Sequence, residues 1–246
     1  GRNINEGCGS TAIETLAGRA DVAAHDAAFA FDGDGDRLLT LDRRGAVVDG
    51  DELIALAALH LRRTDRLRGG GVAVTVMTNF GFHTAMREAG VEVATTAVGD
   101  RYVLNELRER GWALGGEQSG HIIDMGFAPS GDGIAAALLA LEALGDGDLA
   151  ERDAMEKLPQ TLVNVPGVDR DVAAADAGLA AAIAEEDRRL EGRGRVLVRP
   201  SGTEPLVRVM VEAPTAQEAD TVCERLVSAV QALADRGAAA TIDASR

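Results

Sequence analysis

The chain has 246 residues, of which 46% are hydrophobic and 26% are charged. This composition is typical of a folded globular protein and excludes a disordered or fibrous chain. The formal net charge of −15 argues against a nucleic-acid partner and against binding to an anionic membrane surface. The length is sufficient for one large domain or two ordinary ones.

Three features of the sequence bear on the environment of the protein and on whether the chain is whole. Cys8 and Cys223 are far apart and neither has a CxxC partner, which favours a reduced, cytoplasmic environment. No apolar run reaches the roughly 18 residues that a transmembrane helix needs, so we expect no membrane span. Residues 1–5 contain neither an initiating Met nor the start of a signal peptide, and we expect the chain to be a fragment that lacks its beginning.

The first 48 residues are expected to form a helix and three short strands. The helix covers 12–19 and is ended by Gly18. Apolar runs between polar turns predict strands over 27–31, 38–41 and 46–48. A strongly acidic loop joins the first two strands.

From Asp49 onwards, helices and strands alternate. We expect Asp51 to cap a first helix that runs to about Arg63. The later elements are expected as strand 72–76, helix 81–89, strand 91–95, helix 101–110, strand 112–115 and helix 131–144. Apolar strands interleaved with helices predict βαβ units and an α/β fold with a mostly parallel sheet.

A different pattern begins near Pro159. The expected elements are strands 160–165, 195–198 and 206–212 and helices 172–190 and 216–235. This order is typical of a small α+β domain. Residues 236–246 form a polar, Ala-rich tail that we expect to be frayed.

The acidic loop at 32–37 alternates carboxylates with glycines. Asp32, Asp34 and Asp36 are separated by single glycines and are followed by Arg37. Alternate side chains of an extended or looped backbone point the same way, so the three carboxylates can converge on one point. A hard divalent cation relieves their repulsion, and Mg²⁺ is the usual ion where a phosphate shares the site. The alternative is a solvated acidic turn.

A second polar stretch, 115–121, follows the strand expected at 112–115. In open α/β sheets, ligands bind beyond the carboxyl ends of the strands. Glu117 and Ser119 alternate, so both can face one side and hydrogen-bond sugar hydroxyls. His121 is a further candidate site residue. The alternative is a turn at the entry to a helix.

A third stretch, 199–205, lies between two strands of the C-terminal block. Arg199 and Arg208 supply the fork geometry that phosphate prefers. Small residues in this loop expose backbone N–H groups that suit a phosphate oxyanion; they are Ser201, Gly202 and Thr203. The alternative is a hairpin turn stiffened by prolines.

Other residues carry weaker signals. Arg101 follows a strand and could reach a phosphate or a reacting hydroxyl, or lie on the surface at the start of a helix. The histidines outside the second stretch are expected to be structural or exposed; they are His25, His60 and His83.

Together, the three stretches resemble the α-D-phosphohexomutase superfamily. The metal loop of that family has the form DGDGDR, which matches 32–37. Its sugar loop has the form GEXSGH, which matches 116–121, and its phosphate loop has the form RxSGTEP, which matches 199–205. The similarity extends from residue 1 to about residue 235.

The resemblance implies a four-domain enzyme. Residues 1–48 would be the C-terminal part of domain two with the metal loop, residues 49–156 domain three with the sugar loop, and residues 157–246 domain four with the phosphate loop. The serine loop of the family, of the form T-R-x-S-G, is absent from the chain. The partner implied is therefore the missing N-terminal part of the same enzyme, and we expect the chain alone to have no mutase turnover.

The resemblance also implies the chemistry. The family member most similar to the chain would interconvert glucosamine 6-phosphate and glucosamine 1-phosphate through a phosphoserine and a bisphosphate intermediate, on the way to UDP-N-acetylglucosamine and peptidoglycan. Mg²⁺ would be held by Asp32, Asp34 and Asp36. The catalytic candidates are Arg37, Arg101 and His121, and the substrate contacts would be Glu117, Ser119, Arg199, Ser201, Gly202, Thr203 and Arg208.

Several alternatives stay open beside this interpretation. An aspartate-nucleophile phosphatase would use Asp32 or Asp34, but it leaves the second and third stretches unexplained. An EF-hand starting at Asp32 would need Gly and Glu where the chain has Arg37 and Arg43, which disfavours a calcium module. A phosphohexomutase acting on neutral sugars, a non-catalytic phosphosugar-binding module and a homodimer are compatible with the sequence.

Overall fold

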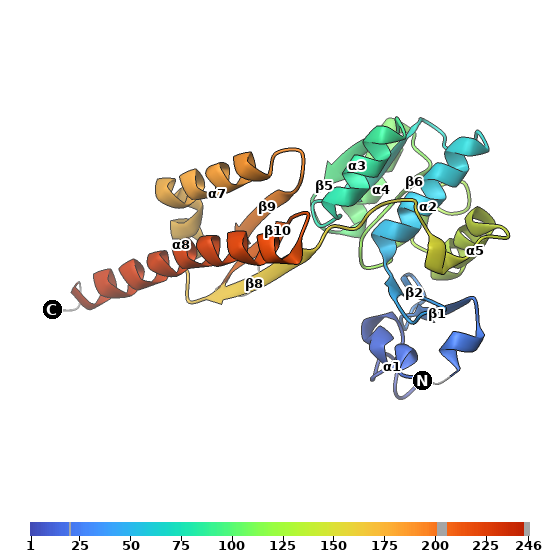
Figure 1. The fold of residues 1–246 in the computed structure, drawn as a ribbon, viewed down its shortest axis with the longest axis horizontal. Helices are drawn as coiled ribbons and strands as arrows, with labels where there is room; N and C mark the ends of the chain where they lie inside the picture. Colours follow the sequence, from blue (N-terminus) through green and yellow to red (C-terminus); the bar gives the residue numbers. More distant parts are fainter. Residues whose placement is uncertain (20, 201–205, 244–246) are drawn as a thin grey trace. The chain divides into compact units, whose positions relative to one another are not determined.

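The computed structural model describes residues 1–19, 21–200 and 206–243. The chain divides into two compact units, Gly1–Lys157 and Leu158–Arg246 (Figure 1). None of the helices in the described ranges combines the length and the apolar character that a membrane-spanning segment needs.

The first unit begins with short helices and a small antiparallel sheet. The helical pieces are η1 (Ser10–Ala12), α1 (Ile13–Ala17) and η2 (Val22–Ala24), and the strands, in sheet order, are β1 (Ala27–Phe31), β2 (Leu38–Asp42) and β3 (Val47–Val48). The strands confirm the prediction. The helix expected over 12–19 is shorter, because a 3₁₀ turn replaces its beginning and the α-helical part ends at Gly18.

Helix α2 (Gly50–Arg63) is capped by Asp49, not by Asp51 as the sequence analysis expected. The Asp49 side chain accepts a hydrogen bond from Glu52 N, and the Glu52 carboxylate accepts one from Asp49 N, both at 3.3 Å. This capping box makes the helix begin two residues earlier than expected, at Gly50. Asp51 is therefore the second residue of the helix, and its side chain is fully buried.

A four-stranded mixed sheet forms the centre of the first unit. Its strands are β4 (Gly71–Thr75), β5 (Glu92–Thr96), β6 (Leu114–Gly116) and β7 (Ile122–Asp124), in the order β5-β4-β6-β7. The pairs β4–β5 and β4–β6 are parallel and β7 is antiparallel to β6. The mostly parallel sheet was predicted. Strand β7 was not, because it has only three residues, too few to give a strand pattern in the sequence.

Helices cover both faces of this sheet. They are α2, α3 (Phe80–Glu88), α4 (Asp100–Arg110) and α5 (Gly133–Leu144), followed by η3 (Leu149–Glu151). Val72 and Val74 of β4 belong to one core with α2, α3 and α5, while Ala73 faces a second core with α4. Burial on both faces explains why β4 is continuously apolar, and it leaves the loops at the carboxyl ends of the strands for function.

The second unit is an antiparallel sheet with helices. The strands are β8 (Gln160–Pro166), β9 (Arg195–Pro200) and β10 (Leu206–Glu212), in the order β8-β10-β9, and the helices are α6 (Arg170–Ala175), α7 (Ala177–Leu190) and α8 (Ala216–Asp243). Val207, Val209 and Val211 of β10 pack in one core with residues of α7 and α8. The predicted α+β pattern is confirmed.

Two helix boundaries in this unit differ from the prediction. The helix expected over 172–190 is two helices, because Asp176 adopts an extended conformation and its side chain accepts a hydrogen bond from Leu179 N to cap α7. Helix α8 continues to Asp243. The expectation of a frayed tail from residue 236 gave too little weight to the high helix propensity of alanine.

Candidate functional site

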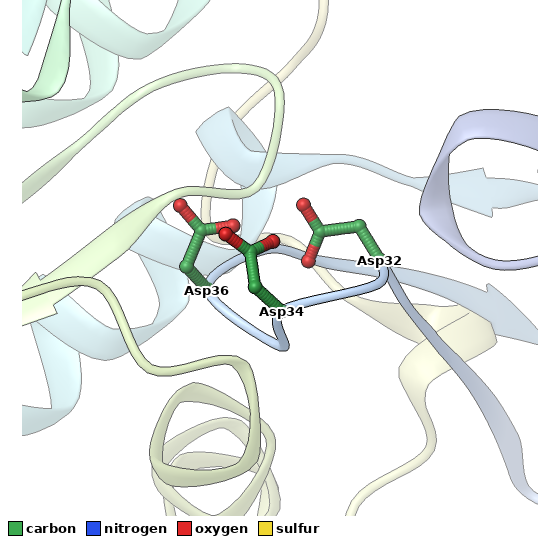
Figure 2. Close-up of side chains that lie close together, drawn as sticks. All are labelled: Asp32, Asp34 and Asp36. Carbon is green, nitrogen blue, oxygen red and sulfur yellow. The ribbon is translucent and has the colours of Figure 1, made fainter. Parts of the chain in front are cut away.

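The acidic loop connects β1 to β2 and is closed by hydrogen bonds from its own backbone N–H groups. Asp32 Oδ1 accepts a hydrogen bond from Arg37 N at 3.1 Å, and Gly35 N donates to Asp32 O at 3.2 Å. One carboxylate oxygen from each of Asp32, Asp34 and Asp36 lies within 4.8 Å of the other two (Figure 2). The loop therefore gathers three oxygen donors at one place, and the metal there stays a prediction.

The electrostatics of this loop favour a cation. Burial, followed by the hydrogen bond and the charge of Asp32, raises the pKa of Asp36, which the nearby His121 partly offsets. Arg37 Nε is 3.9 Å from oxygens of Asp32 and Asp36, too far for a hydrogen bond. Within the described residues, the buried Asp36 Oδ1 has no hydrogen-bond partner. A carboxylate oxygen that is buried, accepts no hydrogen bond and lies close to two other carboxylates fits a hard divalent ion.

The second stretch lies against the acidic loop. His121 Nδ1 is 3.0 Å from Asp36 Oδ2, and Leu38 N donates to Gly120 O at 3.0 Å. Gly120 has a φ of +89°, and a Cβ atom there would overlap the backbone of Leu38. Only glycine allows this approach, so the sequence places two of the predicted stretches side by side.

Glu117 and Ser119 do not alternate along an extended backbone as the sequence analysis assumed. Gly120 N donates to Glu117 O at 2.9 Å, which makes 117–120 a turn. Glu117 Oε1 accepts a hydrogen bond from Gly99 N at 3.0 Å, and Ser119 is exposed at the tip of the turn. Their contact with sugar hydroxyls stays a prediction, but it does not follow from strand alternation.

Arg101 is the second residue of α4, whose N-cap is Gly99, the residue that donates to Glu117. Its Nη2 donates to Tyr102 Oη at 2.7 Å, and its guanidinium lies 4.6 Å from the centre of the Tyr102 ring. The Arg101 side chain is exposed. The loop after β5 thus carries a cation next to the loop after β6, at the carboxyl edge of the sheet.

Two helix starts complete the arrangement, and neither was predicted from the sequence to lie at the site. Gly50 N of α2 donates to Gln118 O at 3.0 Å, and Gly133 N of α5 donates to Gly35 O at 2.8 Å. Each glycine follows an N-cap aspartate, Asp49 or Asp132. An Asp-Gly pair immediately before a helical pattern is the signal that could have identified them.

A buried carboxyl group supports the same edge of the sheet. Asp51 Oδ2 accepts a hydrogen bond from Asn79 N at 2.8 Å, which holds the loop after β4 to α2. Burial, and secondarily the charge of Asp49, raises the pKa of Asp51 to about 7, although the bond from Asn79 opposes the shift. Asp51 is therefore part of the structure behind the loops.

In the second unit, Arg199 and Arg208 face each other across β9 and β10. Both are half-buried, and neither forms an ion pair within the described part of the chain. The pair Arg195 and Glu212 on the same strands forms a salt bridge at 2.7 Å. Like charges directly opposite each other are destabilising unless an anion lies between them. The remaining predicted phosphate contacts, Ser201, Gly202 and Thr203, lie outside the described residues.

Family models match most of the chain. The model for phosphoglucomutase/phosphomannomutase, alpha/beta/alpha domain III, matches residues 49–162, and the model for the phosphoglucomutase/phosphomannomutase C-terminal domain matches residues 162–229. Similar proteins include the phosphoglucosamine mutases of Streptomyces avermitilis, 52% identical over 238 residues, and of Streptomyces coelicolor, 49% identical over 236 residues. Each match covers 94% of this chain and 52% of the relative, so the chain spans about half the length of these relatives.

Solved structures show the same fold. The Aspergillus fumigatus N-acetylphosphoglucosamine mutase in complex with GlcNAc-6P and magnesium has a TM-score of 0.74 at 23% identity, over 92% of this chain and 53% of that one. A phosphoglucomutase/phosphomannomutase family protein from Burkholderia thailandensis has a TM-score of 0.70 at 24% identity, over 90% of this chain and 51% of that one.

Proposed function

Because the chain belongs to the phosphoglucomutase/phosphomannomutase family, we propose that it is the C-terminal part of a phosphoglucosamine mutase, an isomerase that interconverts glucosamine 6-phosphate and glucosamine 1-phosphate. Relatives with that name are about half identical to the chain. The product would serve the synthesis of UDP-N-acetylglucosamine. The transferable phosphoryl group would reside on a serine in a part of the enzyme outside these 246 residues.

Asp32, Asp34 and Asp36 would hold Mg²⁺. The fit rests on the convergence of their oxygens and on the buried Asp36 Oδ1, which has no hydrogen-bond partner within the described residues. A bound Mg²⁺ offsets negative charge on a phosphoryl group during transfer, which depends on positioning and electrostatics more than on covalent chemistry. His121 would fix the orientation of Asp36, and Arg37 would add a positive charge at the rim of the loop.

The remaining contacts would divide between the two units. In the first unit, Glu117 and Ser119 would bind sugar hydroxyls and Arg101 would contact the reacting phosphate. In the second unit, Arg199 and Arg208 would hold the phosphate that is not reacting, together with Ser201, Gly202 and Thr203. The two facing guanidinium groups support an anion there, because an anion would relieve their repulsion.

One observation carries the proposal: the carboxylate loop and the 117–120 turn are joined by the Leu38–Gly120 hydrogen bond and the Asp36–His121 contact. A metal-bound phosphate and a sugar hydroxyl would thereby be presented within one rigid unit. Positioning of this kind is a major source of rate enhancement.

The test uses the chain and a chimera. The chimera carries, in front of residue 1, the part of the Streptomyces avermitilis relative that precedes the matched region. Conversion of glucosamine 6-phosphate to glucosamine 1-phosphate, followed by ³¹P NMR, is expected for the chimera, not for the chain alone, and not for the chimera with Asp34→Asn. Turnover by the chain alone above buffer, or a folded chimera without turnover, would contradict the proposal.

A further inference from the structure

Helix α5 is apolar on all sides over its first nine residues but is covered on one side only; its one charged residue, Glu142, lies near its end and is hydrogen-bonded to Arg66. Residues 133–141 contain no polar side chain. Ala136, Ala137, Leu139 and Ala140 pack into the main core of the first unit. The opposite side exposes Ile134 and Leu138 at 63% each and Leu141 at 44%. A helix that is apolar on all sides is normally buried on all sides.

These three residues form one stripe, which we call the α5 stripe. Ile134, Leu138 and Leu141 are spaced by four and three positions, so they lie on one face of the helix. Scattered exposed aliphatic residues need no explanation, but a contiguous row of large ones is typical of an interaction surface. The stripe contrasts with the acidic character of the chain as a whole.

The stripe starts at the proposed metal loop. Gly133, the residue before Ile134, donates from its N–H to Gly35 O at 2.8 Å. A Cβ atom at Gly133 would lie 2.7 Å from Arg37 O, so the helix start and the loop are in direct contact. A domain that brings a phosphate to Asp32, Asp34 and Asp36 would therefore come next to the start of the stripe.

We propose that the α5 stripe is the docking surface for the part of the enzyme that this chain does not span, the part that would carry the phosphoryl group. The inference rests on the proposed function. The relatives are about twice as long as the matched region, so a body of comparable size is available to cover the stripe. Its contact surface should be apolar, with basic groups toward the start of the stripe, where the three carboxylates of the metal loop lie.

Charge argues against the other occupants. The carboxylates of the metal loop lie at the start of α5, and Asp146 follows its end. A second copy docked through the same stripe would bring acidic surface against acidic surface in a chain of net charge −15, which is unfavourable. An anionic membrane is disfavoured for the same reason.

Thiol labelling tests the proposal in the chain and in the chimera. Both proteins carry Cys8→Ser, because Cys8 is exposed. One variant of each then carries Leu138→Cys in the stripe, and the control variant carries Val172→Cys on α6, where Val172 is 48% exposed. Both introduced thiols should react at similar rates in the chain alone. In the chimera, the thiol at 138 should react at least about tenfold more slowly while the control thiol is unchanged. Equal reactivity of position 138 in the chain and in a folded chimera would overturn the proposal.

Sedimentation of the isolated chain provides an independent test. The proposal expects a monomer, with Ile134→Glu/Leu138→Glu behaving the same. Self-association that increases with concentration and disappears in this variant would show that the stripe binds a second copy and would overturn the proposal. The two proposals can fail separately: protection at position 138 without mutase activity refutes only the function, and an active chimera without protection refutes only the docking surface.

Discussion

Replacing the buried Asp51 by Asn should make the stability of the chain less sensitive to pH. The folded-state pKa of Asp51 is about 7, against an ordinary value of 3.8. The unfolded chain therefore releases this proton at lower pH than the folded chain, and the folded state is progressively destabilised as the pH rises from about 4 to about 7. A difference of about three pKa units corresponds to about 4 kcal/mol at most.

Asn has nearly the same shape as Asp and keeps an oxygen to accept from Asn79 N. The quantity to compare is the unfolding free energy of Asp51→Asn minus that of the wild type, measured by urea unfolding of the chain. We expect this difference to be about 2–4 kcal/mol larger at pH 8 than at pH 4.5. The exposed Asp146→Asn is the matched control and should shift stability by less than about 0.5 kcal/mol at either pH. A difference between Asp51→Asn and wild type that is the same at both pH values would refute the assignment of this titration to Asp51.

Three further outcomes follow from the loops. Gly120→Ala should destabilise the chain by more than about 2 kcal/mol in urea unfolding, because the added Cβ meets the Leu38 backbone and φ is positive, and a loss below about 0.5 kcal/mol would contradict this contact. Arg199→Ala should weaken binding of glucosamine 6-phosphate about tenfold or more in calorimetry, and unchanged affinity would exclude the phosphate role. The chain should bind Mg²⁺ only in the millimolar range, and Asp34→Asn should weaken this further; tight binding would mean that the loop needs no ligand from outside the chain.

The parts of the molecule that depend on local pattern were predictable from sequence. The strands 27–31 and 206–212 are bounded as expected, because apolar runs between polar turns leave few alternatives. The cap of α2 was assigned to the wrong aspartate, since Asp49 and Asp51 both precede the helical pattern and only the reciprocal bond with Glu52 selects between them. The break at Asp176 was missed for a similar reason, because an aspartate within an alanine-rich run is compatible with a helix interior as well as with a cap.

The assembly of the site depends on contacts that no local pattern contains. His121 and Asp36 are 85 positions apart, and their 3.0 Å contact depends on the acidic loop lying against the turn that follows β6. The motif resemblance named both residues but gave no reason for their contact. The glycines that permit it, Gly120 and Gly133, have no chemistry of their own, so their importance is visible only in what a side chain there would strike.

The acidic loop is held mainly by backbone hydrogen bonds, which bears on what a cation would contribute. Arg37 N, Gly133 N and Leu38 N all donate to the loop or to the turn beside it. The positive ends of α2 and α5 also lie at these loops, and such helix starts favour nearby negative charge. A cation with a millimolar dissociation constant adds only about 0.4 kcal/mol to stability when present at that concentration. Mg²⁺ bound there would therefore contribute little to the fold, and its charge would act chiefly on a phosphoryl group brought to the loop.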